Sequence, residues 1–273
     1  AVLACLFLLA RSARMDLPEP GSRPESRRRT LLAGAFVTLA GGAAFIWLPD
    51  HSRIGDFHRV FYDIVTNVWL LKAEPLGPTF YQLAAAFSRA YMVESIESIQ
   101  LIISVVSMLA IPLLVALAAR LTDAGTRWWA FAVLATSGAM ALFFGHVETY
   151  TTPAIAMLAF LWASARALSG DGGAFWPSVF FLLAAALHMQ MLCMGPALVW
   201  VCWRVWQRDR SVLPWVWLVF LVALPLAGLQ WLCLQYPPPY PQHYGGGDGK
   251  MLVLSAHFFS LHHGLGVFNR IAL

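Results

Sequence analysis

Apolar runs of helix length recur along this 273-residue chain and constrain its fold more than any other feature. We expect membrane helices at 30–49, 97–119, 127–145, 149–168, 175–191, 193–206 and 213–235, with a broken one beginning near 251. Each approaches the roughly 20 apolar residues that a helix needs to cross a hydrocarbon core. Only 12% of the residues are charged, about half the share found in soluble globular proteins. The sequence therefore predicts an all-α fold, a polytopic transmembrane helical bundle.

Both ends of the chain lie in apolar sequence, Ala1 within "AVLACLFLLA" and Leu273 within another apolar stretch. We expect a fragment of a longer protein, so that the number of spans is a minimum. Residues 1–29 would be a truncated N-terminal segment with a basic cytoplasmic stretch. Residues 30–273 would form one transmembrane domain, truncated at its C-terminus.

The arginines predict an orientation. Six lie in "RSARMDLPEPGSRPESRRRT", directly before the first span. Further loop arginines are Arg120, Arg127, Arg166, Arg204, Arg208 and Arg210. With seven alternating spans all of them reach one side, which the positive-inside rule makes cytoplasmic. The opposite side receives eight of the fourteen acidic residues and, on or near it, the histidines. A functional site is therefore expected to face outward.

The outward segment 50–96 carries two predicted amphipathic helices. In "IGDFHRVFYDIVTNVWL" the apolar face holds Ile54, Phe57, Phe61, Ile64 and Val68. The polar face holds Asp56, Arg59, Asp63 and Asn67. A second helix over about 79–92 carries a stripe of Phe80, Leu83, Phe87 and Tyr91. Such faces are typical of helices that lie in the membrane interface.

Asp56 begins the first of these helices, between Arg53 and Arg59. A helix N-terminus stabilises the charged form of a carboxylate, which suits a general base at neutral pH. The alternative is that Asp56 only caps and solvates its helix.

The stretch "FFGHVETYTTP" places His146, Glu148 and Tyr150 in a turn between two predicted spans. Ionisable side chains at such a depth are costly and tend to face a cavity or the interior of a bundle. Tyr150 can donate a hydrogen bond to the carboxylate or to a ligand. The alternative is an ordinary hydrated turn, although such a turn needs only the glycine that precedes His146.

The remaining candidates are histidines. His257, His262 and His263 lie in "LSAHFFSLHHGLGVFN", which ends at Asn269. Their spacing is not a standard zinc spacing, so a divalent metal stays an open alternative, and no metal ligand or cofactor is predicted. Interfacial histidines are the plainer interpretation. His188, in "ALHMQMLCMGP", is expected to be a core histidine at the outer end of its helix.

The order of several segments carries a resemblance. The basic stretch is followed by "GDFHRVFYDIV", "EPLGPTFYQLAAAF" and "ESIQLIISVVSMLAIPLLVALAARL". This order resembles the C-type (GT-C) integral-membrane glycosyltransferases, including protein mannosyltransferases and lipid A aminoarabinose transferase. "FFGHVETY" is similar to a glutamate–tyrosine turn of such enzymes and to bacterial membrane proteins bearing "FFGYVE-x-Y". "LSAHFFSLHHGLGVFN" is similar to their serine, histidine and asparagine segment, and the resemblance covers most of residues 28–273.

The resemblance implies a glycosyltransferase of the bacterial inner membrane with its site facing the periplasm. The enzyme would move a sugar, with inversion, from a polyprenyl-phosphate donor to a lipid, glycan or protein acceptor. Its partners would be these substrates and the lipid bilayer, and not nucleic acid.

The resemblance also implies roles for particular residues. Asp56 would be the catalytic base, with Asp50 or Asp63 as substitutes, because the second adjacent acid of many members is Phe57 here. Glu148 would act with it, and His146 and Tyr150 would orient donor or acceptor. The residues expected to bind the lipid phosphate or the substrates are Arg53, Arg59, Lys72, Arg89, Lys250, His257 and Asn269.

Two other classes of protein stay open. A secondary transporter or lipid flippase would favour polar residues or Gly/Pro breaks in the middle of spans. Pro112, Pro196, Pro214 and Pro225 lie in or near predicted spans, but charges are nearly absent from the span middles. A membrane scaffold without catalysis would not need so elaborate an outward segment.

Overall fold

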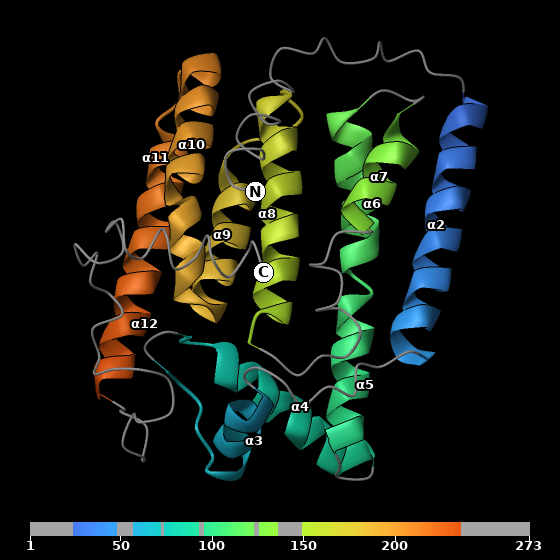
Figure 1. Ribbon diagram of the computed structural model, residues 1–273. Coiled ribbons are helices and arrows are strands. Elements are labelled where there is room, and N and C mark those ends of the chain that lie inside the picture. Colours follow the sequence, from blue (N-terminus) through green and yellow to red (C-terminus); the bar gives the residue numbers. More distant parts are fainter. Residues whose placement is uncertain are drawn as a thin grey trace, which may run out of the picture. The chain divides into compact units, whose positions relative to one another are not determined.

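The computed structural model describes residues 24–47, 57–71, 74–92, 96–122, 126–135 and 149–235 (Figure 1). All of the regular secondary structure in these ranges is helical, so the predicted all-α class is confirmed for this part of the chain. The chain divides into two compact units, Ala1–Pro237 and Pro238–Leu273. The second unit lies outside the described residues, and the following description concerns the first.

The helices follow the predicted apolar runs closely. In chain order they are α2 (Pro24–Trp47), α3 (Phe57–Val65), α4 (Gly77–Tyr91), α5 (Ile96–Ser107), α6 (Ala110–Leu121), α7 (Arg127–Ala135), α8 (Thr151–Leu168), α9 (Phe175–Leu187), the 3₁₀ helix η2 (Met189–Met194), α10 (Gly195–Asp209), α11 (Leu213–Trp217), the π-helix η3 (Leu218–Ala223) and α12 (Leu224–Gln235). The helix expected from residue 30 begins earlier, at Pro24. A proline suits the first helical position because its fixed φ is helical and its missing N–H has no partner to lose there.

Three of these helical segments are long and apolar enough to cross a membrane, which is consistent with a membrane protein. They are Glu97–Leu121, Thr151–Leu168 and Leu213–Gln235, and shorter apolar helices cover Ala35–Trp47 and Phe175–Leu187. The first span is interrupted between α5 and α6, shortly before Pro112. Because proline has no N–H, Pro112 cannot donate a hydrogen bond to the carbonyl of Met108. The helix is therefore interrupted at Met108 and Leu109 and begins again at Ala110. The seven-span topology stays a prediction.

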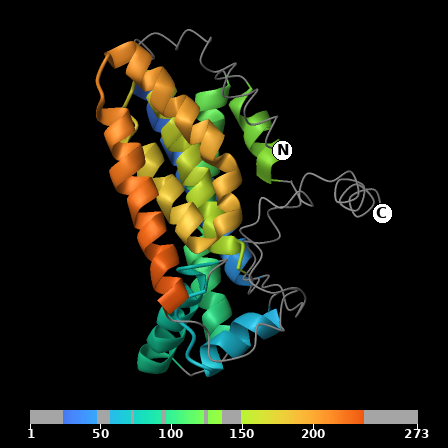
Figure 2. The same cartoon turned by 90° about the vertical axis from the view of Figure 1, so that its left-hand side faces the viewer.

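A large cluster of buried side chains joins α8, α9, α10 and η3. Phe160, Phe181, Leu198 and Val222 belong to it, and the two phenyl rings meet edge to face with 5.7 Å between their centroids. The three consecutive alanines 184–186 of α9 are fully buried. Small side chains let helices approach closely, which explains why α8 and α9 lie side by side (Figures 1 and 2). A second cluster, Phe45, Ala110, Ile111 and Ile155, joins α2 and α6 to α8.

Helices α3 and α4 lie where the sequence predicts two amphipathic helices, and the buried Gln82 holds them together. The chain leaves α3 after Val65 through Asn67, whose φ is 56°. The N–H of Val68 donates to the carbonyl of Asp63 at 2.9 Å, and the N–H of Asn67 donates to that of Ile64 at 3.2 Å, as in a Schellman motif. Gln82 Nε2 donates to the carbonyls of Asp63 and Val68 at 2.9 and 3.1 Å. The C-terminal end of α3 is thus fixed to α4.

The predicted faces of α3 are partly wrong. Asp63, expected on the solvated face, is 3% exposed, whereas Phe61, expected on the apolar face, is 49% exposed. The reason is that α4 and α5 cover the side of α3 that carries Val60, which packs with Tyr81 and Ile103. Tertiary packing, rather than the polarity of the helix alone, decides which face of α3 is buried.

The apolar stripe of α4 faces outward. Leu83, Phe87 and Tyr91 are exposed, while Tyr81 and Ala85 on the other side of the helix are buried. Exposed aromatic side chains on a short helix are typical of the boundary between lipid and water. α4 therefore offers an apolar surface to its surroundings.

The first unit has two chemically different ends. At one of them α3 and α4 lie across the point where α8 begins and α9 ends (Figure 1), and the N–H of Leu76 donates to the carbonyl of Ala186 at 2.8 Å. We call this the glutamate end, after Glu74. The opposite end carries Arg120, Arg166 and Arg208, near the C-termini of α6, α8 and α10. We call it the arginine end.

Candidate functional site

Glu74 is a buried acidic residue in the turn that precedes α4, and its side chain is only 3% exposed. The turn is closed by its own backbone, because the N–H of Glu74 donates to the carbonyl of Leu71 and the N–H of Gly77 donates to that of Glu74. Burying a carboxyl group costs free energy unless polar partners compensate it. Glu74 is therefore a candidate for a functional role.

The sequence "EPLGP" explains how this turn packs so tightly. A Cβ at Gly77 would lie 3.0 Å from the Cβ of Glu74 and 3.1 Å from the carbonyl oxygen of Leu187. Only a glycine permits that approach without a shift of the backbone. Pro75 and Pro78 are buried on either side, and their fixed φ angles limit the conformations open to the turn. The turn carrying Glu74 is thus held against the end of α9.

His188 faces Glu74 from the end of α9. Its Nε2 lies 3.6 Å from Oε1 of Glu74, slightly longer than a hydrogen bond, and its side chain is 5% exposed. The backbone N–H of Gln190 donates to Nδ1 at 3.3 Å. Because Nδ1 accepts this hydrogen bond, the neutral imidazole carries its proton on Nε2, directed at Glu74.

Tyr150 completes the cluster. Its ring stacks on the imidazole of His188, with 4.7 Å between the centroids and 26° between the planes. Tyr150 immediately precedes α8 and is half-buried, between the buried Thr149 and Thr151. We call these three side chains the Glu74–His188–Tyr150 cluster. It connects three segments that are far apart in the sequence.

The cluster has the chemistry of a proton-holding site. A carboxyl group beside an imidazole can hold or pass a proton. Ionisable groups buried together in membrane proteins usually mark functional positions. Glu74 and His188 are almost fully buried, so Tyr150 is the member of the cluster that reaches the surface. The arrangement suits the support and orientation of the chain at Tyr150.

Most of the predicted site residues lie outside the described residues. These are Asp56, Glu148, His146, Arg53, Lys72, His257 and Asn269. Arg59 belongs to α3, but its side chain is not among those described. Of the predicted residues whose side chains are described, Tyr150 lies in the cluster, Arg89 is exposed on α4, and Asp63, the substitute base, is buried on α3. The predicted roles of all of them stay predictions.

The pairing of Glu74 with His188 was not predicted from the sequence. Glu74 belongs to the segment 50–96, which was expected to face outward, and His188 was expected to be a core histidine. The burial of His188 at the end of its helix is confirmed. The available signals were a glutamate inside a Pro/Gly turn and a single histidine directly after an apolar helix. Neither signal indicates that the two residues meet.

No group of three or more His, Cys, Asp and Glu side chains is placed to hold a metal ion in the part of the chain that the structure describes. Comparison of the chain with protein-family models, curated proteins and solved structures found no match.

Proposed function

We propose that the protein is a membrane glycosyltransferase of the GT-C type, which transfers a sugar from a polyprenyl-phosphate donor to an acceptor with inversion. One observation carries this proposal: the buried Glu74–His188–Tyr150 cluster lies at the same end of the first unit as the amphipathic helices α3 and α4. A buried ionisable cluster beside interfacial helices suits chemistry on a substrate that is anchored in lipid.

The surfaces of α3 and α4 support a lipid-linked donor. Phe61, Tyr62 and Trp69 are exposed on the α3 side, in addition to the outward stripe of α4. Aromatic side chains prefer the level of the lipid headgroups. A phosphate carried on a polyprenyl chain lies at that level, so these helices would bring the site to the donor.

The resemblance supplies the chemical step that we propose. The carboxylate of Asp56 takes the proton of the acceptor hydroxyl while that oxygen forms a bond to the anomeric carbon. The bond from the anomeric carbon to the phosphate oxygen breaks, and the polyprenyl phosphate leaves with the electron pair. Arg53, Arg59 and Lys72 are near Asp56 in the sequence and would stabilise the departing negative charge.

The cluster would act by positioning. Tyr150 is joined by the chain to Glu148 and His146 and is held by its stacking on His188. Glu74 in turn fixes the imidazole and lies two residues from Lys72. The cluster thus connects Glu74, which belongs to the same segment of the sequence as Asp56, to Tyr150, which follows Glu148 in the sequence.

The proposed orientation follows from the arginine end. Arg120, Arg166 and Arg208 come from the last turns of three helices, α6, α8 and α10, and gather around the segment 167–172. Positive side chains favour the cytoplasmic side. We therefore place the glutamate end on the periplasmic side of a bacterial inner membrane.

The distribution of charge gives less support to the alternative of a transporter or lipid flippase. Within the three candidate spans, all of which the structure describes, the charged residues are Glu97, Arg120 and Arg166, each close to the end of its span. A pathway for coupled ions usually places ionisable groups near the middle of the membrane.

The test is transfer of label from radioactive polyprenyl-phosphate sugars by the full-length protein in membranes. We expect Asp56→Asn to lower transfer at least about a hundredfold, the usual contribution of a general base. Glu148→Gln tests the second proposed acid in parallel. Asp209→Asn is the matched control, because that exposed carboxylate lies at the arginine end. Folding of each variant is checked by its thermal unfolding in detergent.

Two results would contradict the proposal. Equal transfer by wild type and Asp56→Asn would remove Asp56 from the mechanism. An absence of transfer from every donor, in wild-type protein that unfolds cooperatively, would reject the glycosyltransferase and lead to assays of transport.

A further inference from the structure

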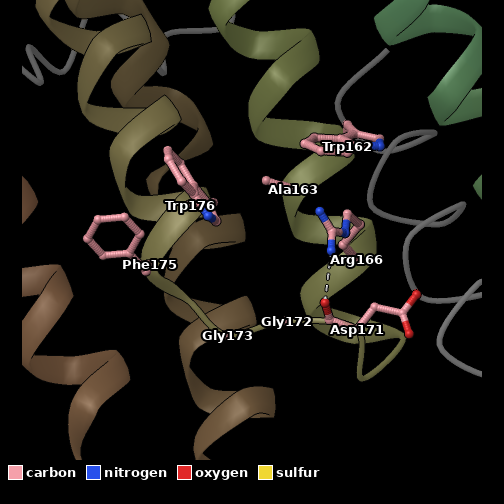
Figure 3. Close-up of a pocket in the computed structure, with 8 residues that line it drawn as sticks. All are labelled: Trp162, Ala163, Arg166, Asp171, Gly172, Gly173, Phe175 and Trp176. Carbon is pink, nitrogen blue, oxygen red and sulfur yellow. Dashed lines mark hydrogen bonds between the residues drawn. The ribbon is translucent and has the colours of Figure 1, made fainter.

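The arginine end contains a cavity that the proposed function does not use (Figure 3). Its volume is about 350 Å³, within the range of small-molecule sites. Trp162, Ala163 and Arg166 line it from α8, and Phe175 and Trp176 line it from the start of α9. The connecting loop Asp171, Gly172 and Gly173 closes one side.

Arg166 supplies a positive charge to this cavity. Its guanidinium lies 5.1 Å from the centre of the Trp162 ring, and its Nη2 donates to the backbone carbonyl of Asp171 at 3.2 Å. Figure 3 shows that the carboxylate of Asp171 points away from Arg166. That carboxylate pairs with Arg120 instead. Among the described residues no carboxylate pairs with Arg166, and its buried Nε has no hydrogen-bond partner there.

The backbone holds Arg166 in this place. Gly170, with a φ of 89°, ends α8. The N–H of Asp171 donates to the carbonyl of Arg166 at 3.0 Å, which closes a Schellman motif. The backbone of Asp171 therefore contacts Arg166 twice: its carbonyl accepts from the guanidinium, and its N–H donates to the carbonyl of Arg166. This reciprocal contact restricts the guanidinium before any ligand arrives, which lowers the entropy lost on binding.

The aromatic walls indicate a ligand with an apolar part. Trp176 is 56% exposed and Phe175 37% exposed, so the cavity opens beside aromatic surface. It lies at the end of a candidate span, Thr151–Leu168, where tryptophan and arginine meet the level of the lipid headgroups. Basic pockets between membrane helices on the cytoplasmic side are suited to anionic headgroups.

We infer that this cavity binds the phosphate group of an anionic phospholipid. The guanidinium of Arg166 donates hydrogen bonds to the phosphate oxygens, and Trp162 and Trp176 flank the glycerol part. The charge of the guanidinium requires an anionic group, and the two indoles favour an amphiphile over free phosphate. The site is at the opposite end from the Glu74–His188–Tyr150 cluster, so it does not depend on the proposed glycosyl transfer.

The experiment is native mass spectrometry of the purified full-length protein, titrated with phosphatidylglycerol or with phosphatidylcholine. We expect wild type to retain one phosphatidylglycerol more tightly than phosphatidylcholine. Arg166→Gln should weaken retention of phosphatidylglycerol about tenfold, the loss of one charge-assisted contact. Arg204→Gln is the matched control, because Arg204 is exposed on α10 and donates to Gln207 rather than lining the cavity.

A second variant guards against misfolding. Trp176→Leu changes a side chain that is more than half exposed, so it should fold, and it should weaken retention of both lipids by removing one wall. An arm with millimolar inorganic phosphate separates the two sources of a phosphate group.

Three results would overturn the inference. Equal retention of the two lipids by wild type would show that the cavity does not prefer an anionic phospholipid to a zwitterionic one. Equal losses in Arg166→Gln and Arg204→Gln would indicate attraction by overall charge. Displacement of phosphatidylglycerol by inorganic phosphate, without an effect of Trp176→Leu, would assign the site to a soluble anion.

Discussion

The two ends of the first unit use charged residues in opposite ways. At the glutamate end, Glu74 and His188 meet at 3.6 Å with side chains that are 3% and 5% exposed. At the arginine end, the ion pairs Arg120–Asp171 and Arg208–Asp209 are each between about a quarter and a half exposed. Removing one partner of a buried polar contact strongly destabilises a protein, whereas an exposed ion pair contributes little to the free energy of unfolding. The first arrangement fits a site, and the second fits a surface that holds the loop between α8 and α9.

The largest expected effect comes from His188→Phe. The phenyl ring can keep the stacking on Tyr150, but it removes the polar group that faces Glu74. We expect the free energy of unfolding to fall by about 3 kcal/mol, since the buried carboxyl group of Glu74 loses the polar imidazole that faces it. Chemical unfolding in detergent micelles, followed by tryptophan fluorescence, measures the change.

The matched variant at the arginine end is Asp171→Asn, which removes the carboxylate that pairs with Arg120. Its effect should stay below about 1 kcal/mol, as for other exposed pairs. If the two variants lost the same stability, the contrast between the ends would not hold.

Gly77→Ala should have the next largest effect. The added methyl group meets the Cβ of Glu74 and the carbonyl oxygen of Leu187 at about 3 Å, and one of these neighbours is backbone. Overpacking of this kind lowers the free energy of unfolding by about 2 kcal/mol. Gly173→Ala is the control, because a Cβ there meets nothing within 4 Å. It should be neutral or stabilise by about 0.5 kcal/mol. The ranking of the two unfolding midpoints decides whether the Glu74 turn is as tight as described.

A smaller loss is expected for Arg208→Lys. Arg208 Nη1 donates to the carbonyl of Ala167 at 2.7 Å, and Nη2 donates to that of Gly172 at 2.9 Å. The single ammonium group of lysine cannot reproduce this fork, so about 1 kcal/mol should be lost. Arg204→Lys keeps the charge on an exposed position of the same helix and should leave the melting temperature unchanged. An equal loss of stability in both variants would assign the effect to α10 itself rather than to the hydrogen bonds from Arg208 to Ala167 and Gly172.

The smallest effect is a pH dependence at the arginine end. The hydrogen bond from Arg208 lowers the pKa of the Asp209 carboxyl below its ordinary value. A group whose pKa is lowered by folding stabilises the protein above its unfolded pKa, and this contribution is lost as the pH falls through the folded pKa. The stability difference between wild type and Asp209→Asn should therefore shrink below about pH 4. High salt should reduce it at every pH, because both side chains are exposed. A stability difference between wild type and Asp209→Asn that increased as the pH fell would contradict this prediction.

Much of the fold was predictable from local patterns. The positions of α4, α8, α9 and the segment 213–235 agree with the apolar runs and with the Pro/Gly turns between them. Three members of the predicted α4 stripe, Leu83, Phe87 and Tyr91, are exposed. The fourth, Phe80, packs against the buried side chains shared by α3, α4 and α5. The faces of α3 could not be assigned in this way, because α4 and α5 bury Asp63 and leave Phe61 outside.

The candidate site was less predictable than the fold. Tyr150 was identified from its turn, but its partner His188 and the buried Glu74 belong to segments that no local pattern connects. The cavity at the arginine end is a similar case. Arg166 was predicted as a marker of topology, and its place between Trp162 and the peptide of Asp171 depends on how α8 and α9 are joined.

By itself the sequence determined the all-α class, the positions of the apolar helices and the gathering of loop arginines. These follow from hydropathy and from the helical repeat, which act over a few turns of one segment. Tertiary structure alone decided that Glu74, His188 and Tyr150 meet, and that a cavity opens beside Arg166. Such contacts depend on close packing between segments distant in the chain, where Gly77 and the alanines of α9 permit the approach.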